Sequence, residues 1–334
     1  MSGLSTPGRI VTPCLDLHVT DRLVLSTIDG AADLLIEELR SLPSVHSIRQ
    51  LSAVAVECTV DGPLREIVAC SLYSTMAIAL EPPILPPLKS ATGVLRALST
   101  PITFRVGTRD PESRRQLIKA VERDLGWSNH PGRWIVNLTE SPYGWIAELG
   151  PLSWMQRFGR LERLPWSTTP LVAEVLVRLA KVRPGDRALD PFCGTGTIPL
   201  AVRRRQPTSR VLGTDHDPRA IEIAIRNSRH DIELALSEAE ALPLAAGSLD
   251  RIVANLPFGK QVGTHRINRS LYPRVLAEID RVLTPDGRAV LLTEDKRLIR
   301  SAIDHVKTLK VARQRVLKYN GATPTAYVLA RPRR

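Results

Sequence analysis

One short stretch near the middle of the chain constrains its fold more than any other. Residues 187–189 follow the turn Pro184-Gly185-Asp186 and predict a short buried strand, and residues 199–205 continue at helical spacing. Between them, residues 190–198 read Asp-Pro-Phe-Cys-Gly-Thr-Gly-Thr-Ile. A strand, a glycine-containing turn and a helix in this order let backbone amides approach a ligand closely. The stretch therefore predicts a cofactor loop in an open α/β sheet.

The spacing of the glycines narrows the class of cofactor. The loop has no Gly-x-Gly-x-x-Gly for a pyrophosphate and no Gly-Lys-Ser/Thr for a triphosphate, which disfavours nicotinamide and nucleoside triphosphate ligands. A second predicted strand, residues 210–214, ends at Asp215, whose carboxylate can accept two hydrogen bonds from a ribose diol. A solvated turn aspartate is the alternative, and the interval after the glycine loop favours the ribose role. Asp217 and Pro218 predict the start of a helix over 218–228.

A second motif lies at the end of a later predicted strand, residues 250–254. Asn255-Leu256-Pro257-Phe258 would stand at the carboxyl edge of the sheet, where open α/β proteins bind their ligands. An Asn side-chain carbonyl and the backbone carbonyl beside a proline can both accept from one NH₂ group, while a Phe ring stacks on the attached plane. Two acceptors draw a delocalised amine toward tetrahedral character. The two motifs together indicate methyl transfer to an exocyclic base nitrogen, without a strong general base.

These motifs resemble those of a known family. Residues 190–198 are similar to the first motif of Rossmann-type methyltransferases, and residues 255–273 with 287–295 resemble THUMP-containing tRNA guanine-N2-methyltransferases that modify acceptor-stem position 6. The resemblance covers residues 180–330 and implies S-adenosylmethionine as cofactor and tRNA as partner. It implies catalytic roles for Asn255, Pro257 and Phe258. It also implies cofactor contacts from Asp190, Phe192, Cys193, Gly194, Gly196, Thr197, Asp215, His216, Glu238, Ala239 and Asn255.

The remaining segments complete an α/β fold with a front part of α+β character. Strands over 287–293, 310–317 and 325–330, the last two joined by Asn320-Gly321, fit a seven-stranded Rossmann-like sheet with an antiparallel last strand. A β-α-β-β-α-β order over the first 80 residues, with a helix over 64–74, predicts a ferredoxin-like unit. We expect a ferredoxin-like domain over 1–85, a THUMP-like RNA-binding domain over 86–151, a linker over 152–169 and the methyltransferase domain over 170–334. An ordinary α+β accessory domain is the alternative for 86–151, and the proline-rich run 82–87 is expected to break any regular element.

Composition supports a polyanionic partner. The 334-residue chain carries a formal net charge of +12, and phosphate neutralisation drives much of nucleic-acid affinity. Candidate RNA contacts are Lys260, Arg266 and Arg269, which follow the motif of residues 255–258, with Arg157 and Arg160 in the linker. A solvated loop is the alternative for the first three. The four cysteines are dispersed, which predicts no metal site and no disulfide scaffold, and we expect a monomeric cytoplasmic protein.

Two other functions stay open at this point. An adenine-N6 methyltransferase acting on DNA or RNA uses the same kind of amine-binding motif. Only Leu256, the run of residues that follows it and the two predicted N-terminal domains argue against this function. A non-catalytic RNA-binding protein could retain the same sheet. The nucleotide position, the choice between tRNA and rRNA, and mono- or dimethylation are also left open by the sequence.

Overall fold

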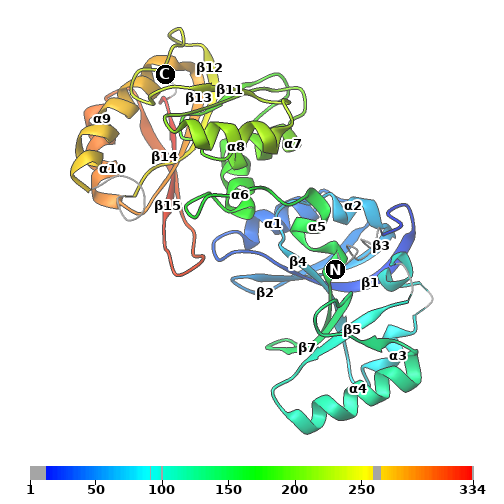
Figure 1. The fold of residues 1–334 in the computed structure, drawn as a ribbon. Coiled ribbons are helices and arrows are strands. Elements are labelled where there is room, and N and C mark those ends of the chain that lie inside the picture. The colour runs from blue at the N-terminus through cyan, green and yellow to red at the C-terminus, as the bar shows by residue number, and fades with distance from the viewer. Residues whose placement is uncertain (1–12, 91, 99–100, 259–264, 333–334) are drawn as a thin grey trace, which may run out of the picture. The chain divides into compact units, whose positions relative to one another are not determined.

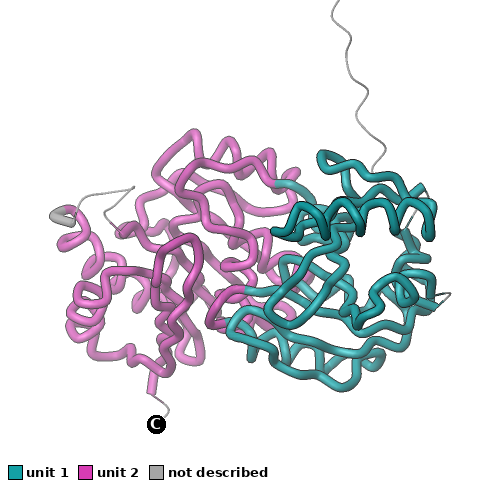
Figure 2. Tube along the Cα trace, turned by 90° about the horizontal axis from the view of Figure 1, so that it is seen from below, with its two compact units in different colours: residues 1–27, 31–160 teal, residues 28–30, 161–334 magenta. Residues whose placement is uncertain are grey.

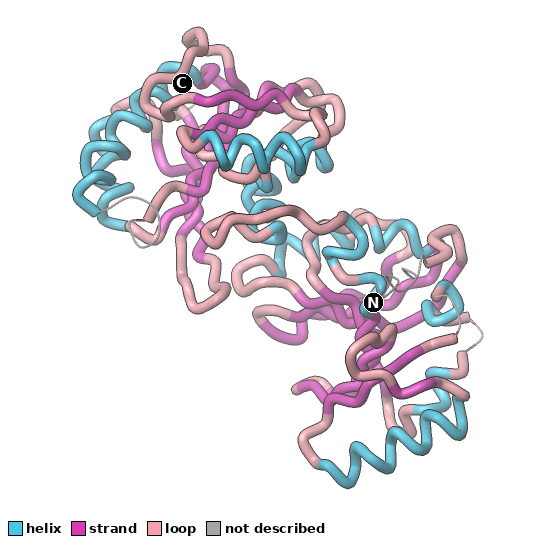
Figure 3. Tube along the Cα trace, viewed as in Figure 1, coloured by secondary structure: helices cyan, strands magenta, loops and turns pink. Residues whose placement is uncertain are grey.

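The computed structural model describes residues 13–90, 92–98, 101–258 and 265–332. The chain divides into two compact units (Figure 2). Unit 1 consists of Met1–Thr27 and Ala31–Arg160, and unit 2 consists of Ile28–Gly30 and Leu161–Arg334. The boundary between them falls inside the predicted linker. Each unit is built on one sheet with its own helices (Figure 3).

The first part of unit 1 has the predicted β-α-β-β-α-β order. Its elements are β1 (His18–Ser26), α1 (Ala32–Leu39), β2 (Val45–Ser52), β3 (Ala55–Pro63), α2 (Leu64–Val68) and β4 (Thr75–Leu80). These strands lie in the order β2-β3-β1-β4, and every adjacent pair is antiparallel. This is the ferredoxin-like arrangement expected from the sequence.

One helix of this part is shorter than expected. The sequence predicts a helix over 64–74, but α2 ends at Val68. The guanidinium of Arg157 donates to the carbonyls of Val68, Cys70 and Tyr73 at 2.8, 2.6 and 2.7 Å. It also lies 3.7 Å from the centre of the Tyr73 ring. A distant side chain therefore satisfies carbonyls that a continuing helix would bond internally.

The rest of unit 1 extends the same sheet. Its elements are α3 (Leu85–Leu88), η1 (Val94–Ala97), β5 (Thr103–Gly107), α4 (Pro111–Leu125), β6 (Ser128–Asn129), β7 (Val136–Ser141), β8 (Gly144–Leu149), η2 (Gly150–Leu152) and α5 (Trp154–Phe158). Because β4 pairs with β8, one eight-stranded sheet crosses the boundary predicted at residue 85, so the division there stays a prediction. The proline-rich run was wrongly expected to exclude regular structure, since α3 places its prolines in a first helical turn, where no N–H is needed.

Unit 2 has the seven-stranded sheet expected from the sequence. Its elements are α6 (Pro170–Ala180), β9 (Arg187–Asp190), α7 (Thr197–Arg205), β10 (Arg210–Asp215), α8 (Pro218–Ser228), β11 (Glu233–Leu236), β12 (Leu249–Asn255), α9 (His265–Val282), β13 (Leu283–Thr293), α10 (Lys296–His305), β14 (Lys310–Val316) and β15 (Thr325–Ala330). The strand order is β11-β10-β9-β12-β13-β15-β14, with β15 antiparallel to both neighbours. The chain reverses its direction of winding between β9 and β12, which makes that edge the expected ligand site.

Helices cover both faces of this sheet (Figure 1). Helix α6 packs against α7, and α9 packs against α10. The largest side chains of the α9–α10 layer, including Tyr272, Leu276 and Ile279, join residues of β12 and β13 in one buried apolar cluster. The β14–β15 connection contains Asn320 and Gly321 at φ angles of 50° and 75°, as a tight hairpin turn requires.

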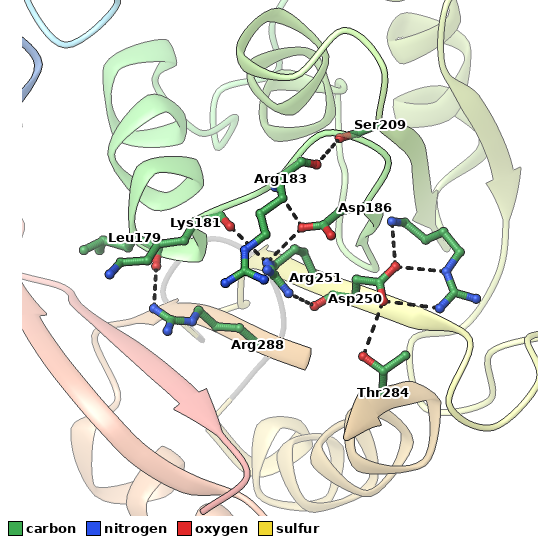
Figure 4. A network of polar contacts seen from close by, with 10 residues as sticks. Leu179, Lys181, Arg183, Asp186, Ser209, Asp250, Arg251, Thr284 and Arg288 are labelled. Atoms are coloured by element: carbon green, nitrogen blue, oxygen red, sulfur yellow. Dashed lines mark hydrogen bonds and ion pairs between the residues drawn. The ribbon is translucent and has the colours of Figure 1, made fainter. Parts of the chain in front are cut away.

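A polar network ties the amino ends of β9 and β12 to the end of α6 (Figure 4). The backbone N–H and the Nε of Arg187 both donate to Asp250 Oδ2 at 2.9 Å. Arg251, with 7% of its side chain exposed, donates to the Lys181 carbonyl and lies 3.2 Å from Asp186 Oδ2. These contacts hold the edge of the sheet opposite to the predicted site.

Candidate active site

The loop after β9 is fastened to the end of the neighbouring strand β10. The N–H of Cys193 donates to the Thr214 carbonyl at 2.9 Å, and the N–H of Gly194 donates to Asp215 Oδ2 at 2.8 Å. Gly194 and Gly196 have φ angles of 51° and 84°, a region that residues with a Cβ rarely adopt. The sequence-predicted loop and the predicted ribose carboxylate are therefore brought together.

The two glycines have different surroundings. A Cβ added to Gly194 would meet no heavy atom of the described chain within 4 Å. A Cβ added to Gly196 would lie 3.2 Å from the Cβ of Ala224 in α8. Gly194 thus leaves open space at the loop, whereas Gly196 permits the close approach of α8 to the start of α7.

Asp190 ends β9 with a buried carboxyl group. Its exposed fraction is 2%, and its Oδ1 accepts from the N–H of Phe192 at 3.0 Å. Its Oδ2 is buried and has no hydrogen-bond partner within the part of the chain that the structure describes. Burial raises the pKa of Asp190 well above its ordinary value, and the negative charge of Asp215 adds to this rise. A positively charged ligand at this position would stabilise the ionised carboxylate.

Asp215 stands at the end of β10 with both oxygens in use. Oδ2 accepts from Gly194, and Oδ1 accepts from the N–H of Asp217 at 3.0 Å. A carboxylate offers about four lone-pair sites, so acceptor capacity remains for a diol. His216, with 59% of its side chain exposed, has Nδ1 3.4 Å from Asp215 Oδ1.

The segment after β11 reaches the same edge of the sheet. The N–H of Ser237 donates to the Asp215 carbonyl at 3.1 Å. Glu238 follows with an exposed side chain, and Ala239 is buried. The structure thus places the two predicted adenine contacts directly after a residue that is bonded to Asp215.

Three further residues of the loop are packed rather than exposed. Cys193 is buried against Gly213, and burial raises the pKa of its thiol, as do the charges of Asp190 and Asp215. A thiol with a raised pKa is a poor nucleophile, so Cys193 serves as a small packing residue. Phe192 packs on the apolar cluster beside β12, and Thr197 is buried at the start of α7.

The second motif begins at the end of β12, the strand beside β9. The Nδ2 of Asn255 donates to Thr168 Oγ1 at 3.0 Å. Its Oδ1 is buried and, among the described residues, has no hydrogen-bond partner. A buried acceptor without a donor is uncommon in folded proteins and marks a place where a ligand donor would fit.

Pro257 differs from the prediction. Its carbonyl already accepts two hydrogen bonds from α9, from Asn268 Nδ2 and from the hydroxyl of Tyr272, each at 2.8 Å. Both lone pairs are used, so the expectation that this carbonyl binds the substrate amine is not supported. Tyr272 also contacts Thr293 Oγ1 at 2.9 Å, and burial raises its pKa. These contacts fasten the motif to the protein instead.

The other residues of the motif are divided between the core and the surface. Leu256 is buried, and its N–H donates to the Leu292 carbonyl at 3.0 Å, which continues the pairing of β12 with β13. Phe258 is half-buried, so part of its side chain is available to another molecule.

The predicted RNA contacts have different outcomes. Arg157 is removed from them, because its guanidinium bonds three carbonyls within unit 1. Arg160 and Arg269 are exposed. Lys260 lies outside the described residues, and of Arg266 only the backbone, in α9, is described.

Sequence reasoning missed three residues that contact the motifs. Thr168 holds the Asn255 amide, while Asn268 and Tyr272 hold the Pro257 carbonyl. Asn268 and Tyr272 lie inside the run of residues 255–273 that carried the resemblance, and that run is the signal that could have identified them. Thr168 precedes the sheet by a whole helix and had no such signal.

No group of three His, Cys, Asp or Glu side chains in the described residues is placed to hold a metal ion. None of the helices that the structure describes is both long and apolar enough to cross a bilayer.

Comparisons with known proteins agree with this geometry. Residues 165–323 match the family model described as an RMKL-like methyltransferase domain. The tRNA (guanine(6)-N2)-methyltransferase of Thermus thermophilus is 34% identical over 246 residues, which cover 68% of this chain and 72% of that enzyme. The bovine tRNA (guanine(6)-N(2))-methyltransferase THUMP3 is 33% identical over 156 residues, 42% of this chain but only 31% of that protein.

A solved structure extends the likeness to nearly the whole chain. The crystal structure of TrmN from Thermus thermophilus matches with a TM-score of 0.76 and 27% sequence identity, covering 93% of this chain and 99% of that one. The fold, the cofactor loop and these relatives lead to one assignment. The chain belongs to the family of Rossmann-like, S-adenosylmethionine-dependent methyltransferases that includes the tRNA guanine-N2-methyltransferases.

Proposed function

We propose that this protein transfers a methyl group from S-adenosylmethionine to the exocyclic N2 amine of a guanosine in tRNA. One observation carries the proposal. The buried Oδ1 of Asn255, which has no partner in the described residues, stands at the carboxyl edge of β12, beside the strand that leads into the cofactor loop. An amine of the substrate would supply the missing donor.

The residues at the end of β9 and β10 fit the cofactor. Gly194 leaves open space beside the main chain, and Asp190 has a buried carboxylate oxygen that lacks a partner in the described chain. We assign the methionine portion to the loop of Asp190, Phe192, Cys193, Gly194, Gly196 and Thr197, the ribose to Asp215 with His216 beside it, and the adenine to Glu238 and Ala239. When bound, the cofactor supplies an electrophilic methyl group on its sulfonium.

The protein's part in the reaction is to hold and orient the amine. The guanine N2 lone pair is delocalised into the ring. Two acceptors that bond the NH₂ group shift the nitrogen toward tetrahedral geometry, which localises the lone pair for attack on the methyl group. We assign these acceptors to Asn255 Oδ1 and to the backbone carbonyl of Leu256, the residue directly before Pro257. The Pro257 carbonyl is excluded because Asn268 and Tyr272 occupy it. Phe258 stacks on the base.

The substrate has to reach this edge as an unstacked base. A paired guanine is enclosed between its neighbours in the stack, so contact of its whole plane with Phe258 requires that the nucleotide be flipped out. Arg269 and Arg160 are exposed and suit contacts with the phosphate backbone. Lys260 and Arg266 stay predictions for the same role.

The position of the target nucleotide is part of the proposal. Both the Thermus and the bovine relatives are named for guanine 6 of tRNA, and we propose the same acceptor-stem position here. The THUMP-like function of residues 86–151 stays a prediction. We also propose that the protein acts as a monomer in the cytoplasm.

The test is a labelling experiment. Purified protein is incubated with bulk tRNA and methyl-labelled cofactor, and the digested nucleosides are identified by mass spectrometry. We expect label in N2-methylguanosine, and loss of that label when guanine 6 of a single tRNA transcript is replaced by adenine. Label in N6-methyladenosine would identify an adenine methyltransferase. Cofactor binding without any label, in tRNA or DNA, would identify a non-catalytic protein.

A further inference from the structure

The segment of residues 161–169, which leads into α6, is fastened to the rest of unit 2 by side-chain contacts. The amide of Asn227 in α8 accepts from the N–H of Glu162 and donates to its carbonyl, both at 2.9 Å. The Glu162 carboxylate also pairs with Arg226 at 2.7 Å. Two neighbouring residues of α8 therefore hold the start of this segment.

Farther along, the segment reaches the cofactor loop. Ser167 Oγ lies 3.1 Å from Thr195 Oγ1, and Thr195 is 2% exposed. The Thr195 carbonyl accepts from Asn227 Nδ2 at 2.9 Å, so the residue is held at two points. Ser167 Oγ also accepts from the N–H of Leu164, which shapes the turn before it. The serine hydroxyl thus connects this turn to the loop between Gly194 and Gly196.

The next residue reaches the other motif. Thr168 Oγ1 accepts from Asn255 Nδ2 at 3.0 Å. An amide is planar, so an Nδ2 that is bonded to Thr168 leaves Oδ1 directed elsewhere, and that atom is the buried acceptor described above. Ser167 and Thr168 therefore contact the loop after β9 and the last residue of the neighbouring strand β12. Because consecutive Cα atoms are only about 3.8 Å apart, the two contacts lie close together.

We propose that Ser167 and Thr168 are positioning residues that set the cofactor loop and the amine-binding motif in register with each other. Ser167 acts through Thr195, and Thr168 acts through Asn255. The inference rests on the proposed function and extends it, because methyl transfer requires donor and acceptor atoms about 3–3.5 Å apart and aligned. The segments that carry Thr195 and Asn255 follow separate strands and can move relative to each other unless a contact joins them. The adjacent hydroxyl groups of Ser167 and Thr168 supply such a contact.

The two residues have separable effects. Loss of the Thr168 hydroxyl frees the Asn255 amide to rotate. Its NH₂ group can then face the substrate NH₂ group, and two donors cannot form the hydrogen bond that Oδ1 would accept. Catalysis then falls while the cofactor loop is untouched. Loss of the Ser167 hydroxyl loosens the cofactor loop and weakens cofactor binding, with the amide still held.

The experiment first compares four single variants with the wild type. Thr168→Val removes the hydroxyl at nearly constant shape, Thr168→Ser keeps it, and Ser167→Ala removes its neighbour. Thr169→Val is the matched control, because Thr169 is the N-cap residue before α6 and its side chain makes no cap hydrogen bond. Each protein is measured for kcat with tRNA, for Kd of S-adenosylhomocysteine by calorimetry and for Tm.

We expect Thr168→Val to lower kcat by about tenfold or more with unchanged Kd. A loss of this size corresponds to one hydrogen bond, the one that orients the Asn255 amide. Thr168→Ser and Thr169→Val should stay near the wild type, and Ser167→Ala should raise Kd with little change in kcat. In an Asn255→Ala background, Thr168→Val should have no further effect. The Tm values identify any variant that fails to fold. If Thr168→Val does so, Thr168→Ala, which also lacks the hydroxyl, replaces it in the comparison.

The two hypotheses fail separately. The identity of the methylated nucleoside tests the proposed function, whereas the ratio of variant to wild-type rates tests the positioning role on whichever nucleoside is labelled. A Thr168→Val protein with wild-type kcat, or one whose defect lies wholly in cofactor Kd, overturns the role of Thr168. Additive losses in the Asn255→Ala background overturn it as well.

Discussion

The charged and amide side chains at the two edges of the sheet in unit 2 differ in their hydrogen bonding. At the amino edge the charged groups find partners: Arg187 bonds Asp250, and Arg251 bonds the Lys181 carbonyl beside Asp186 (Figure 4). At the carboxyl edge, Asp190 Oδ2 and Asn255 Oδ1 are buried without partners in the described residues.

The difference separates what stabilises the fold from what prepares it to bind. A buried polar atom without a partner costs about 1–3 kcal/mol, so such atoms beside the predicted cofactor loop mark places where a ligand donor would fit. Thr197 and Thr214, near the same edge, also have buried hydroxyl oxygens that lack a partner in the part of the chain described. At the amino edge only the Ser248 hydroxyl lacks a partner among the described residues, and the charged groups there are paired. At the carboxyl edge, the Asp190 carboxylate and the Asn255 amide each have an atom that a ligand could bind.

The two aspartates show the contrast in their pKa values. The Arg187 guanidinium holds the pKa of Asp250 below its ordinary value, and burial raises the pKa of Asp190 well above it. Asp250 therefore stabilises the fold above its unfolded-state pKa and loses this effect as the pH falls. Asp190 has the opposite sign: its stabilising effect is present below its unfolded-state pKa and is lost as the pH rises through its folded-state pKa.

The largest effect that would break the comparison is expected at Asn255. Asn255→Ala removes the acceptor at the carboxyl edge and should lower kcat by about 10²- to 10³-fold, in the range found for single groups that stabilise a transition state. Cofactor Kd and Tm should change little. Asn255→Asp, which keeps an acceptor oxygen, should retain more activity than Asn255→Ala. An equal loss of cofactor binding would mean that Asn255 serves the cofactor instead of the amine.

A pair of glycines gives the next largest effect. Gly185 and Gly194 flank β9 at opposite edges, both have positive φ, and a Cβ at either would meet no described atom within 4 Å. Alanine at either position should therefore cost about the same in backbone strain, roughly 1–2 kcal/mol. Only Gly194→Ala should also weaken S-adenosylhomocysteine binding, by about tenfold or more, because it fills the space assigned to the ligand. Calorimetric titration of both variants measures the difference, and equal Kd values would contradict the assignment.

The amino edge should respond in stability and not in catalysis. Asp250→Asn removes the charge that holds Arg187 and should lower the free energy of unfolding by about 1–3 kcal/mol, measured by urea unfolding at pH 7. The loss should shrink as the pH falls through the unfolded-state pKa toward the lower folded-state pKa of Asp250, because the wild-type carboxylate is protonated over that range. The kcat of the folded variant should match the wild type, and a large catalytic defect would show that this edge also serves the reaction.

The smallest effect is expected at Asp190 and has the opposite sign. Asp190→Asn should raise the Tm of the ligand-free protein at neutral pH by about 2–4 °C, because folding of the wild type must either protonate this carboxylate or bury its charge. The gain should disappear at pH 4, where the wild-type group is protonated. Cofactor binding should weaken in the same variant. A variant less stable than the wild type at pH 7 would place Asp190 among the stabilising groups.

Much of this arrangement was predictable from local sequence. The loop of residues 190–198, the helix over 218–228 capped by Asp217, and the Asn320-Gly321 hairpin all have the predicted form. These features depend on residues near one another in the chain: a glycine that tolerates positive φ, an aspartate that accepts from an N–H two residues on, a proline without a donor. The end of α2 was not predictable in this way, because Arg157 bonds its carbonyls from 87 to 89 residues away.

The sequence by itself determined the class of sheet, the loop of residues 190–198 and the position of residues 255–258 at the end of a strand, since each is specified by short-range spacing and backbone preference. The tertiary structure alone decided which atoms remain free to act. Asn268 and Tyr272 occupy the Pro257 carbonyl, and Thr168 holds the Asn255 amide across 87 residues. Hydrogen-bond capacity is used up by whichever groups the fold brings within about 3 Å, and no local pattern encodes those partners.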